Sequence, residues 1–148
     1  MKAVYKGVWL AAVMAVTPIA ASAQDQARVY DQGGVVAVTL IDVEPGQFDA
    51  YMANLNGLWR RSMEEGKRRG EILNYMVVSN MAAGPGDPDV LTVVTYRDAA
   101  VMDTSLDELD RRTAALQGSV EAASRATVER GRLRTILGNE LWRVVTFR

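Results

Sequence analysis

The stretch from Val35 to Val43 is apolar on both sides of an extended chain. Side chains alternate between the two faces of a strand, so one face carries Val36, Val38 and Leu40. The other face carries Val35, Ala37 and Ile41. A small antiparallel sheet usually leaves one face polar. A strand that is apolar on both faces therefore predicts helices over one face and a second layer, a second subunit, over the other.

The next segment has the pattern of an amphipathic helix. After the turn at Pro45-Gly46, apolar side chains recur every three or four residues, at Phe48, Tyr51, Met52, Leu55, Leu58 and Trp59. The opposite side is charged, as is typical of a solvated helix face, and carries Arg60, Arg61, Glu64, Glu65, Lys67 and Arg68. Gly70 is well placed to end this helix in a left-handed conformation.

Two further apolar runs predict a hairpin. They extend from Ile72 to Met81 and from Val90 to Arg97, and the loop between them contains the turn-forming sequence Gly-Pro-Gly-Asp-Pro. Asp98 is expected to cap a short helical piece that follows the second run.

A second helical region is predicted after the hairpin. Ser105 and Glu108 form a capping-box pattern at its start, and the apolar positions then continue to Leu137. Breaks are plausible at Gly118 and Gly131, and Gly138-Asn139 are expected to end the region. A last strand is predicted from Leu141 to Phe147.

The predicted order of elements is β-α-β-β-α-β, the split unit of the ferredoxin-like α+β fold. Right-handed crossovers place both helices on one face of a four-stranded antiparallel sheet and leave the other face for dimerisation. The first and third runs are the most apolar and are expected inside the sheet. Asn74 and Arg143 interrupt the other two runs, which are expected at its edges.

The first 23 residues resemble a signal peptide. Lys2 and Lys6 precede an apolar stretch, and the small residues Ala21-Ser22-Ala23 predict cleavage after Ala23. A retained membrane anchor is the alternative, but the apolar stretch is short for a span. We therefore expect a periplasmic or secreted protein that is not membrane-bound once the leader is removed. The mature chain would consist of a flexible lead-in over residues 24–34 and one domain over 35–148.

Charge and missing residue types exclude several functions. The leader holds two of the 17 basic residues and none of the 18 acidic ones, which leaves a net charge of −3 in the mature chain. Nucleic acid is therefore not an expected partner. The sequence has no Cys and no His, so it has no disulfide, no Ser-His-Asp triad and no usual ligand for zinc or haem iron. Tyrosine would be the only conventional haem ligand left, and neither a metal nor a cofactor is expected.

The chain resembles the dimeric α/β-barrel superfamily, as an exported member. The similarity rests on a pattern of elements over most of the mature chain: Val38-Thr39-Leu40, Pro45-Gly46, Tyr51, Trp59, Gly70, Tyr75, Asp89-Val90-Leu91, Tyr96 and the run from Trp142 to Phe147. In that superfamily two such sheets pack face to face, and ligands bind between helices and sheet. Its members include haem enzymes, cofactor-free oxygenases, isomerases and proteins without established activity, so the fold alone does not assign a function.

The resemblance implies a ligand site lined by side chains of the first helix and the strands. Candidates are Tyr51, Trp59, Asn74, Tyr75, Tyr96 and Arg97, and Arg143 joins them because it interrupts an apolar strand. Aromatic residues at helical spacing are also typical of a core, and polar residues in edge strands often only prevent aggregation. No catalytic residue can be assigned from the sequence.

Two functions follow from these observations. The first is an exported homodimer that binds a small apolar or aromatic molecule or has a non-catalytic role. The alternative is a cofactor-independent oxygenase or isomerase. In it Tyr51, Trp59 or Asn74 would orient the substrate, and a carboxylate or tyrosine would move the proton. Asparagine and tryptophan occur in the polar cluster of such oxygenases, but the histidine that often accompanies them is missing here.

Overall fold

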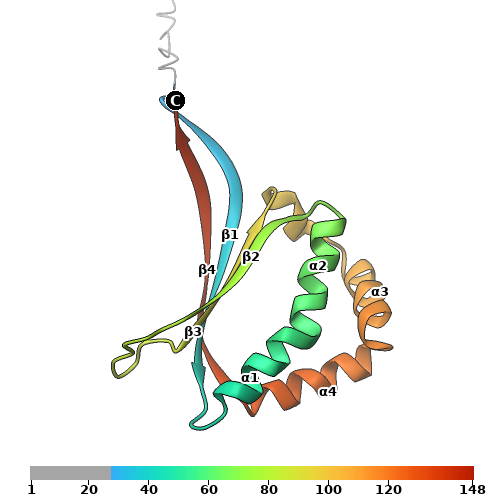
Figure 1. Cartoon of the computed structure of the whole chain (residues 1–148). Coiled ribbons are helices and arrows are strands. Elements are labelled where there is room, and N and C mark those ends of the chain that lie inside the picture. The colour runs from blue at the N-terminus through green and yellow to red at the C-terminus, as the bar shows by residue number, and fades with distance from the viewer. Residues whose placement is uncertain (1–27) are drawn as a thin grey trace, which may run out of the picture.

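A computed structural model describes residues 28–148 and contains one four-stranded antiparallel sheet with helices on one side of it (Figure 1). The strands are β1 (Tyr30–Val43), β2 (Ile72–Ser79), β3 (Val90–Tyr96) and β4 (Arg134–Phe147). Their order in the sheet is β2-β3-β1-β4, and every neighbouring pair is antiparallel. This is the predicted ferredoxin-like topology, with the first and third strands inside and the strands of Asn74 and Arg143 at the edges. The predicted signal peptide and the start of the predicted lead-in lie outside the described residues.

The first helical region is bent. It consists of α1 (Phe48–Asn54), a π-type segment (Leu55–Trp59) and α2 (Arg60–Arg68), and the backbone of Gly57 departs from helical values with φ −80 and ψ −105. Such wide turns are found at sites where a helix changes direction. Gly70 has a φ of +70 and ends the region, as predicted.

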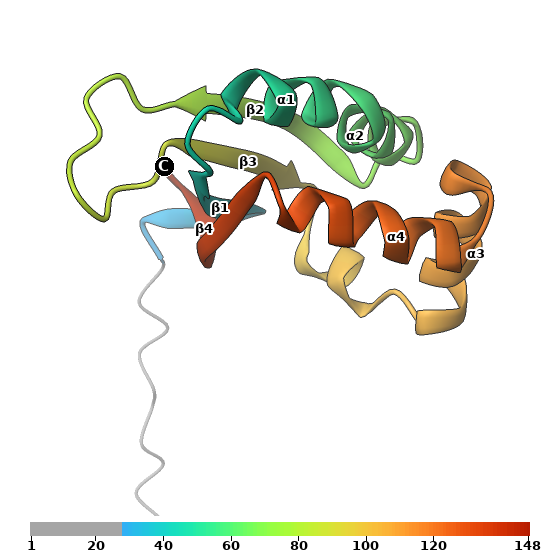
Figure 2. The ribbon, with the colours of Figure 1, turned by 90° about the horizontal axis from the view of Figure 1, so that it is seen from below.

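The second helical region is a pair of helices that stand away from the sheet at one end (Figure 2). A 3₁₀ turn (Ala99–Asp103) begins after Asp98, whose side chain accepts a hydrogen bond from the Ala100 N–H as expected of a cap. Helices α3 (Leu106–Gln117) and α4 (Val120–Gly131) follow. Ser105 caps α3, Ser119 caps α4, and Gly118 breaks the two helices apart at a φ of +87.

Two predicted boundaries are wrong: the start of β1 and the start of β4. β4 begins at Arg134 rather than Leu141, so the predicted helix to Leu137 ends at Gly131 instead. β1 begins at Tyr30, inside the segment predicted as a flexible lead-in. The reason is the same in both cases: the long strands supply backbone partners to each other from Tyr30–Phe147 to Val43–Arg134. The local sequence of these segments favours neither helix nor strand strongly, so the backbone hydrogen bonds between the two strands decide their structure.

The pairing of β1 with β4 contains two irregularities. Ile41 lies opposite Ile136 and Leu40 lies opposite Gly138, so Leu137 is an extra residue in β4. Near the other end, Gly33 and Gly34 of β1 lie opposite the single residue Val144, so β1 has one extra residue there. Beyond them, the two strands continue as a two-stranded ribbon that projects past the rest of the sheet (Figure 1).

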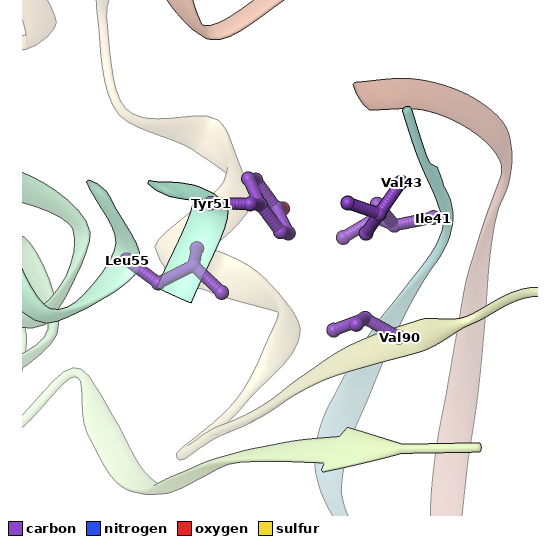
Figure 3. Close-up of a cluster of buried hydrophobic side chains, with 5 residues drawn as sticks. All are labelled: Ile41, Val43, Tyr51, Leu55 and Val90. Atoms are coloured by element: carbon purple, nitrogen blue, oxygen red, sulfur yellow. The ribbon is translucent and has the colours of Figure 1, made fainter. Parts of the chain in front are cut away.

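The core lies between the first helix and the two central strands. Ile41, Val43 and Val90 point from the sheet towards Tyr51 and Leu55 of the helical region (Figure 3). Tyr51 and Ile41 are each 1% exposed. Full burial of such side chains contributes about 1.5–3 kcal/mol each, so this cluster fixes the position of α1 over the sheet.

The opposite face of the sheet is apolar, as the alternation in β1 predicts. Register places on this face Val36, Val38, Leu40, Met76, Val78, Leu91, Val93, Trp142 and Val144. No helix of the described chain covers it, and Trp142 remains 59% exposed. Its polar members include Glu140, which accepts a hydrogen bond of 2.8 Å from Trp142 Nε1. We call this surface the bare sheet face.

Gly34 allows β1 to approach β3 closely. A Cβ atom at Gly34 would lie 2.3 Å from the backbone oxygen of Tyr96, whereas at Gly33 the nearest atom is a Val144 side-chain carbon at 3.2 Å. Gly34→Ala is therefore expected to destabilise the protein by about 1–3 kcal/mol, because a backbone must move. Gly33→Ala is the matched control and should cost less. Urea unfolding of both variants measures the difference, and equal losses would contradict this account.

Among residues 28–148, no helix is both long enough and apolar enough to span a membrane.

Candidate functional site

The space between the helices and the sheet contains a small cavity that combines aromatic and cationic side chains. Its volume is about 180 Å³. Polar groups reach it from Thr39, Tyr51, Thr92, Arg130, Arg134 and Asn139. Its apolar walls come from Ile41, Leu55, Trp59 and Ile136. We call it the arginine cavity.

Local chain geometry brings the two arginines together. Arg130 lies in the last turn of α4 and Arg134 is the first residue of β4, so only a tight turn separates them. Leu133 anchors this turn by packing against the core, and its carbonyl accepts a 3.0 Å hydrogen bond from the Glu44 N–H. The turn therefore holds both guanidinium groups at one end of the helix-to-sheet space.

Tyr51 lies between the core and the arginines. Its ring is buried, and the guanidinium carbon of Arg134 is 5.7 Å from the ring centroid, within the range of a cation–π contact. Burial raises the pKa of the Tyr51 hydroxyl, although the charges of Arg134 and Arg130 oppose this shift. The phenol therefore stays protonated at neutral pH and acts as a hydrogen-bond donor, not as a general base.

The two arginines lack acidic partners within the described chain. Arg130 Nε donates a 2.9 Å hydrogen bond to the neutral Asn54 Oδ1, and Arg134 Nε is buried without a hydrogen-bond partner among residues 28–148. Burial, with the nearby charge of Arg134, lowers the pKa of Arg130. Arginine nevertheless keeps its charge at any physiological pH. The cavity is thus a positively charged site with unused donors.

Trp59 belongs to this cavity and also to a second, shallower site. Its ring meets Tyr75 edge to face, with centroids 5.3 Å apart. The Tyr75 hydroxyl donates to Glu64, which raises the Tyr75 pKa, and Lys67 Nζ lies 5.7 Å from the Tyr75 ring centroid. These contacts occupy Tyr75 with neighbours from α2, so it supports the helix more than it faces a ligand.

Tyr96 lies in a separate cavity between α2, β3 and α3, with a volume of about 410 Å³. Burial raises the pKa of its hydroxyl, and the charge of Glu71 adds to the shift. Glu71 is paired with Arg69 at 2.9 Å and with Arg112 at 3.1 Å, so the charges of this cavity already compensate one another. It offers less unused binding capacity than the arginine cavity.

The structure brings together only some of the candidate residues from the sequence. Tyr51 and Trp59 share the arginine cavity, and Tyr75 touches Trp59 from the side. Asn74 is exposed opposite Thr95, a position on the bare sheet face. Arg97 is exposed and paired with Asp98, and Arg143 is exposed near the Gly33 carbonyl.

Five polar residues that line the cavity were not among the sequence candidates: Thr39, Thr92, Arg130, Arg134 and Asn139. Arg134 lies within the helix that the sequence pattern continues to Leu137, and on a helix it would be expected at the surface. Arg130 lies on a helix in both the prediction and the structure, and its charge by itself gives no sign of burial. A usable signal was present, because Arg134-Thr135-Ile136-Leu137 follows Gly131 and contains β-branched residues that favour a strand. On a strand, Arg134 starts the inward-facing series of β4.

No three acidic side chains within residues 28–148 gather in a way that would hold a metal ion. The groups that line the arginine cavity are cationic, hydroxylic, amide or aromatic. They are suited to binding and orienting a molecule that accepts hydrogen bonds.

Comparison with known proteins gives similarity at the level of the fold. No protein-family model matches the chain, and no curated protein matches it by sequence. A dimeric ferredoxin-like protein from an uncultured marine organism is 6% identical, with a TM-score of 0.48 over 80% of this chain and 90% of that chain. The cofactor-independent oxygenase SnoaB from Streptomyces nogalater is 14% identical, with a TM-score of 0.42 over 74% and 90% of the two chains.

A dimeric ferredoxin-like protein of unknown function from Thermobifida fusca is 13% identical, with a TM-score of 0.40 over 77% of this chain and 92% of that chain. At these identities and TM-scores the similarities assign neither an activity nor an assembly. The strand order and the helices of the chain itself establish the ferredoxin-like α+β fold, as its resemblance to the dimeric α/β-barrel superfamily predicts.

Proposed function

We propose that this protein is an exported homodimer that binds a small, partly apolar molecule between its helices and its sheet. The observation that carries the proposal is the arginine cavity, which combines apolar walls with hydrogen-bond donors that have no partner in the described chain. Native binding sites for small molecules have this composition: mostly apolar surface with a few convergent polar groups.

The bare sheet face supports the homodimer. It is a mostly apolar surface over four strands, and exposed surfaces of that kind mark interfaces. Two copies related by a two-fold axis would cover each other's face, and a stable pair is expected to bury about 1,600 Å² in total.

Retained ligand and subunit number can be measured together. Native mass spectrometry of protein purified from its source should give a mass of two chains, with an additional small molecule lost at higher collision energy. A mass of one chain at micromolar concentration would contradict the dimer. Ligand-free protein that also fails to bind any small molecule offered to it would contradict the binding function.

The same mass spectrum tests the export proposal. A signal peptide cleaved after Ala23 predicts a mature chain that begins at Gln24. A chain that retains the residues before Gln24 when recovered from the extracytoplasmic fraction would contradict the cleavage.

The oxygenase or isomerase function has weaker support. In that hypothesis Trp59 and Asn74 are both candidates to orient the substrate. Trp59 lines the arginine cavity, whereas Asn74 lies on the edge strand β2, on the bare sheet face. The phenols in the helix-to-sheet space, those of Tyr51, Tyr75 and Tyr96, all have raised pKa values, so none supplies a base at neutral pH. The described residues that line the arginine cavity include no carboxylate. Binding without proton transfer is therefore the function we retain.

A further inference from the structure

We propose that the ligand of the arginine cavity is a small organic monocarboxylate, held by Arg134 and Arg130 with its apolar part against Trp59. This inference rests on the proposed binding function and names the chemical class of the ligand. Three independent properties of the cavity support it: its charge, its unused donors and its size.

The charge of the cavity is not compensated within the described chain. Elsewhere in the helix-to-sheet space the partly buried guanidinium groups are neutralised, since Arg69 and Arg112 both pair with Glu71. Arg130 and Arg134 instead lie close enough for one charge to lower the pKa of the other, and neither forms an ion pair within residues 28–148. Two like charges partly withdrawn from water without a counter-ion are unfavourable, and a bound anion would reduce this cost.

The unused donors of the cavity suit a carboxylate. Arg130 and Arg134 both line the cavity, and a planar guanidinium can present two N–H groups to two carboxylate oxygens. Asn139 Oδ1 already accepts a 3.0 Å hydrogen bond from Thr39 Oγ1, which leaves its amide nitrogen to donate. The Tyr51 hydroxyl is a further donor, because its raised pKa keeps it protonated. Donors therefore exceed acceptors around this space.

The size and walls of the cavity select an organic anion over an inorganic one. A cavity of about 150 Å³ accommodates benzene, so a volume of about 180 Å³ suits a carboxylate the size of benzoate. Ile41, Leu55 and Ile136 offer contacts to an apolar group, and Trp59 adds an aromatic one. Inorganic phosphate would satisfy the arginines but leave these apolar walls without a partner.

Calorimetric titration with three probes tests the proposal. Benzoate is expected to bind the wild-type dimer, whereas benzyl alcohol, which has a similar shape but no charge, should bind at least tenfold more weakly. Inorganic phosphate should also bind more weakly than benzoate. Phosphate binding as tight as benzoate binding would identify an inorganic anion site and overturn the organic class.

Arg134→Met removes the charge and keeps an unbranched side chain of similar length. It is expected to weaken benzoate binding by at least tenfold, because a hydrogen-bonded charge pair is lost. Arg143→Met is the matched control: it changes another arginine of β4, one that is exposed and lies outside the cavity, and it should leave binding unchanged. Equal benzoate affinity in wild type and Arg134→Met would overturn the proposal.

A second measurement keeps the test valid if Arg134→Met alters stability. Without ligand, this variant should unfold at the same temperature as wild type or higher, because it removes an uncompensated charge. Benzoate should raise the melting temperature of wild type but not of the variant. A variant that melts lower than wild type without ligand and still gains stability from benzoate would contradict the role of Arg134.

The outcomes also separate this inference from the proposed function. If wild-type protein binds benzyl alcohol as well as benzoate, or retains a neutral molecule on purification, small-molecule binding stands and the carboxylate class fails. If none of the probes binds and the purified protein carries no small molecule, both proposals fail.

Discussion

Val38→Glu is expected to convert the proposed dimer into monomers. Val38 lies on an interior strand at the middle of the bare sheet face, opposite Val93 of β3. In a two-fold assembly the substitution buries a carboxylate in each copy without a cationic partner. The cost, about 4 kcal/mol, corresponds to an increase of about a thousandfold in the dimer dissociation constant. Sedimentation velocity over a concentration series measures this change.

The fold of one copy should tolerate Val38→Glu, because no helix covers this side of the strand. Circular dichroism should therefore remain that of the wild type. Val128→Glu is the matched control, since it introduces the same change at a position of α4 that is 62% exposed. A Val38→Glu protein that sediments as a dimer, or a Val128→Glu protein that does not, would refute the assignment of the interface.

Tyr51→Ala is expected to cause the largest loss of stability among substitutions in the first helix. Tyr51 is 1% exposed and packs against Ile41, Val43 and Val90. Truncation of a buried aromatic side chain removes its burial energy and leaves a cavity, at a cost of about 3–5 kcal/mol. Domains are typically stable by about 5–15 kcal/mol, so this is a large fraction of the total. Urea unfolding measures the loss.

Two variants define what Tyr51→Ala measures. Phe48→Ala removes an aromatic ring from the same helix, but Phe48 is 42% exposed, so about 1 kcal/mol or less should be lost. Tyr51→Phe keeps the ring and removes only the hydroxyl, so the core should survive. If Phe48→Ala were as destabilising as Tyr51→Ala, the core would not be centred where the structure places it.

Local sequence patterns were sufficient to predict most of the fold. The alternation in β1, the spacing from Phe48 to Trp59 and the capping serine at position 105 each have a physical cause that acts within a few residues. The boundaries near Tyr30 and Arg134 could not be predicted in this way. They depend on the pairing of two segments about one hundred residues apart, as in the hydrogen bond between Thr39 and Asn139.

The candidate site was predicted only in part, for a related reason. Tyr51 and Trp59 were candidates because the superfamily resemblance implies a ligand site between helices and sheet, and helical spacing directs their side chains inward. Arg130 and Arg134 carry no such pattern, since a charged residue near the end of a helix normally faces water. Their common cavity arises from the turn after Gly131, and only the three-dimensional structure brings them beside Tyr51.

The extra residue at Leu137 determines which residues of β4 face the arginine cavity and which face the bare sheet face. Arg134 and Ile136 face the helices before it, and Asn139 and Leu141 face them after it, although the strand period of two would have placed Asn139 on the other side. Deleting one residue here would reverse the two faces of one half of β4. Either Arg134 would move to the bare sheet face, or Trp142 would move to the helix side, and an adjacent residue would take its place. Evolutionary changes of length in β4 should therefore occur in steps of two residues, or be compensated by a one-residue change in β1.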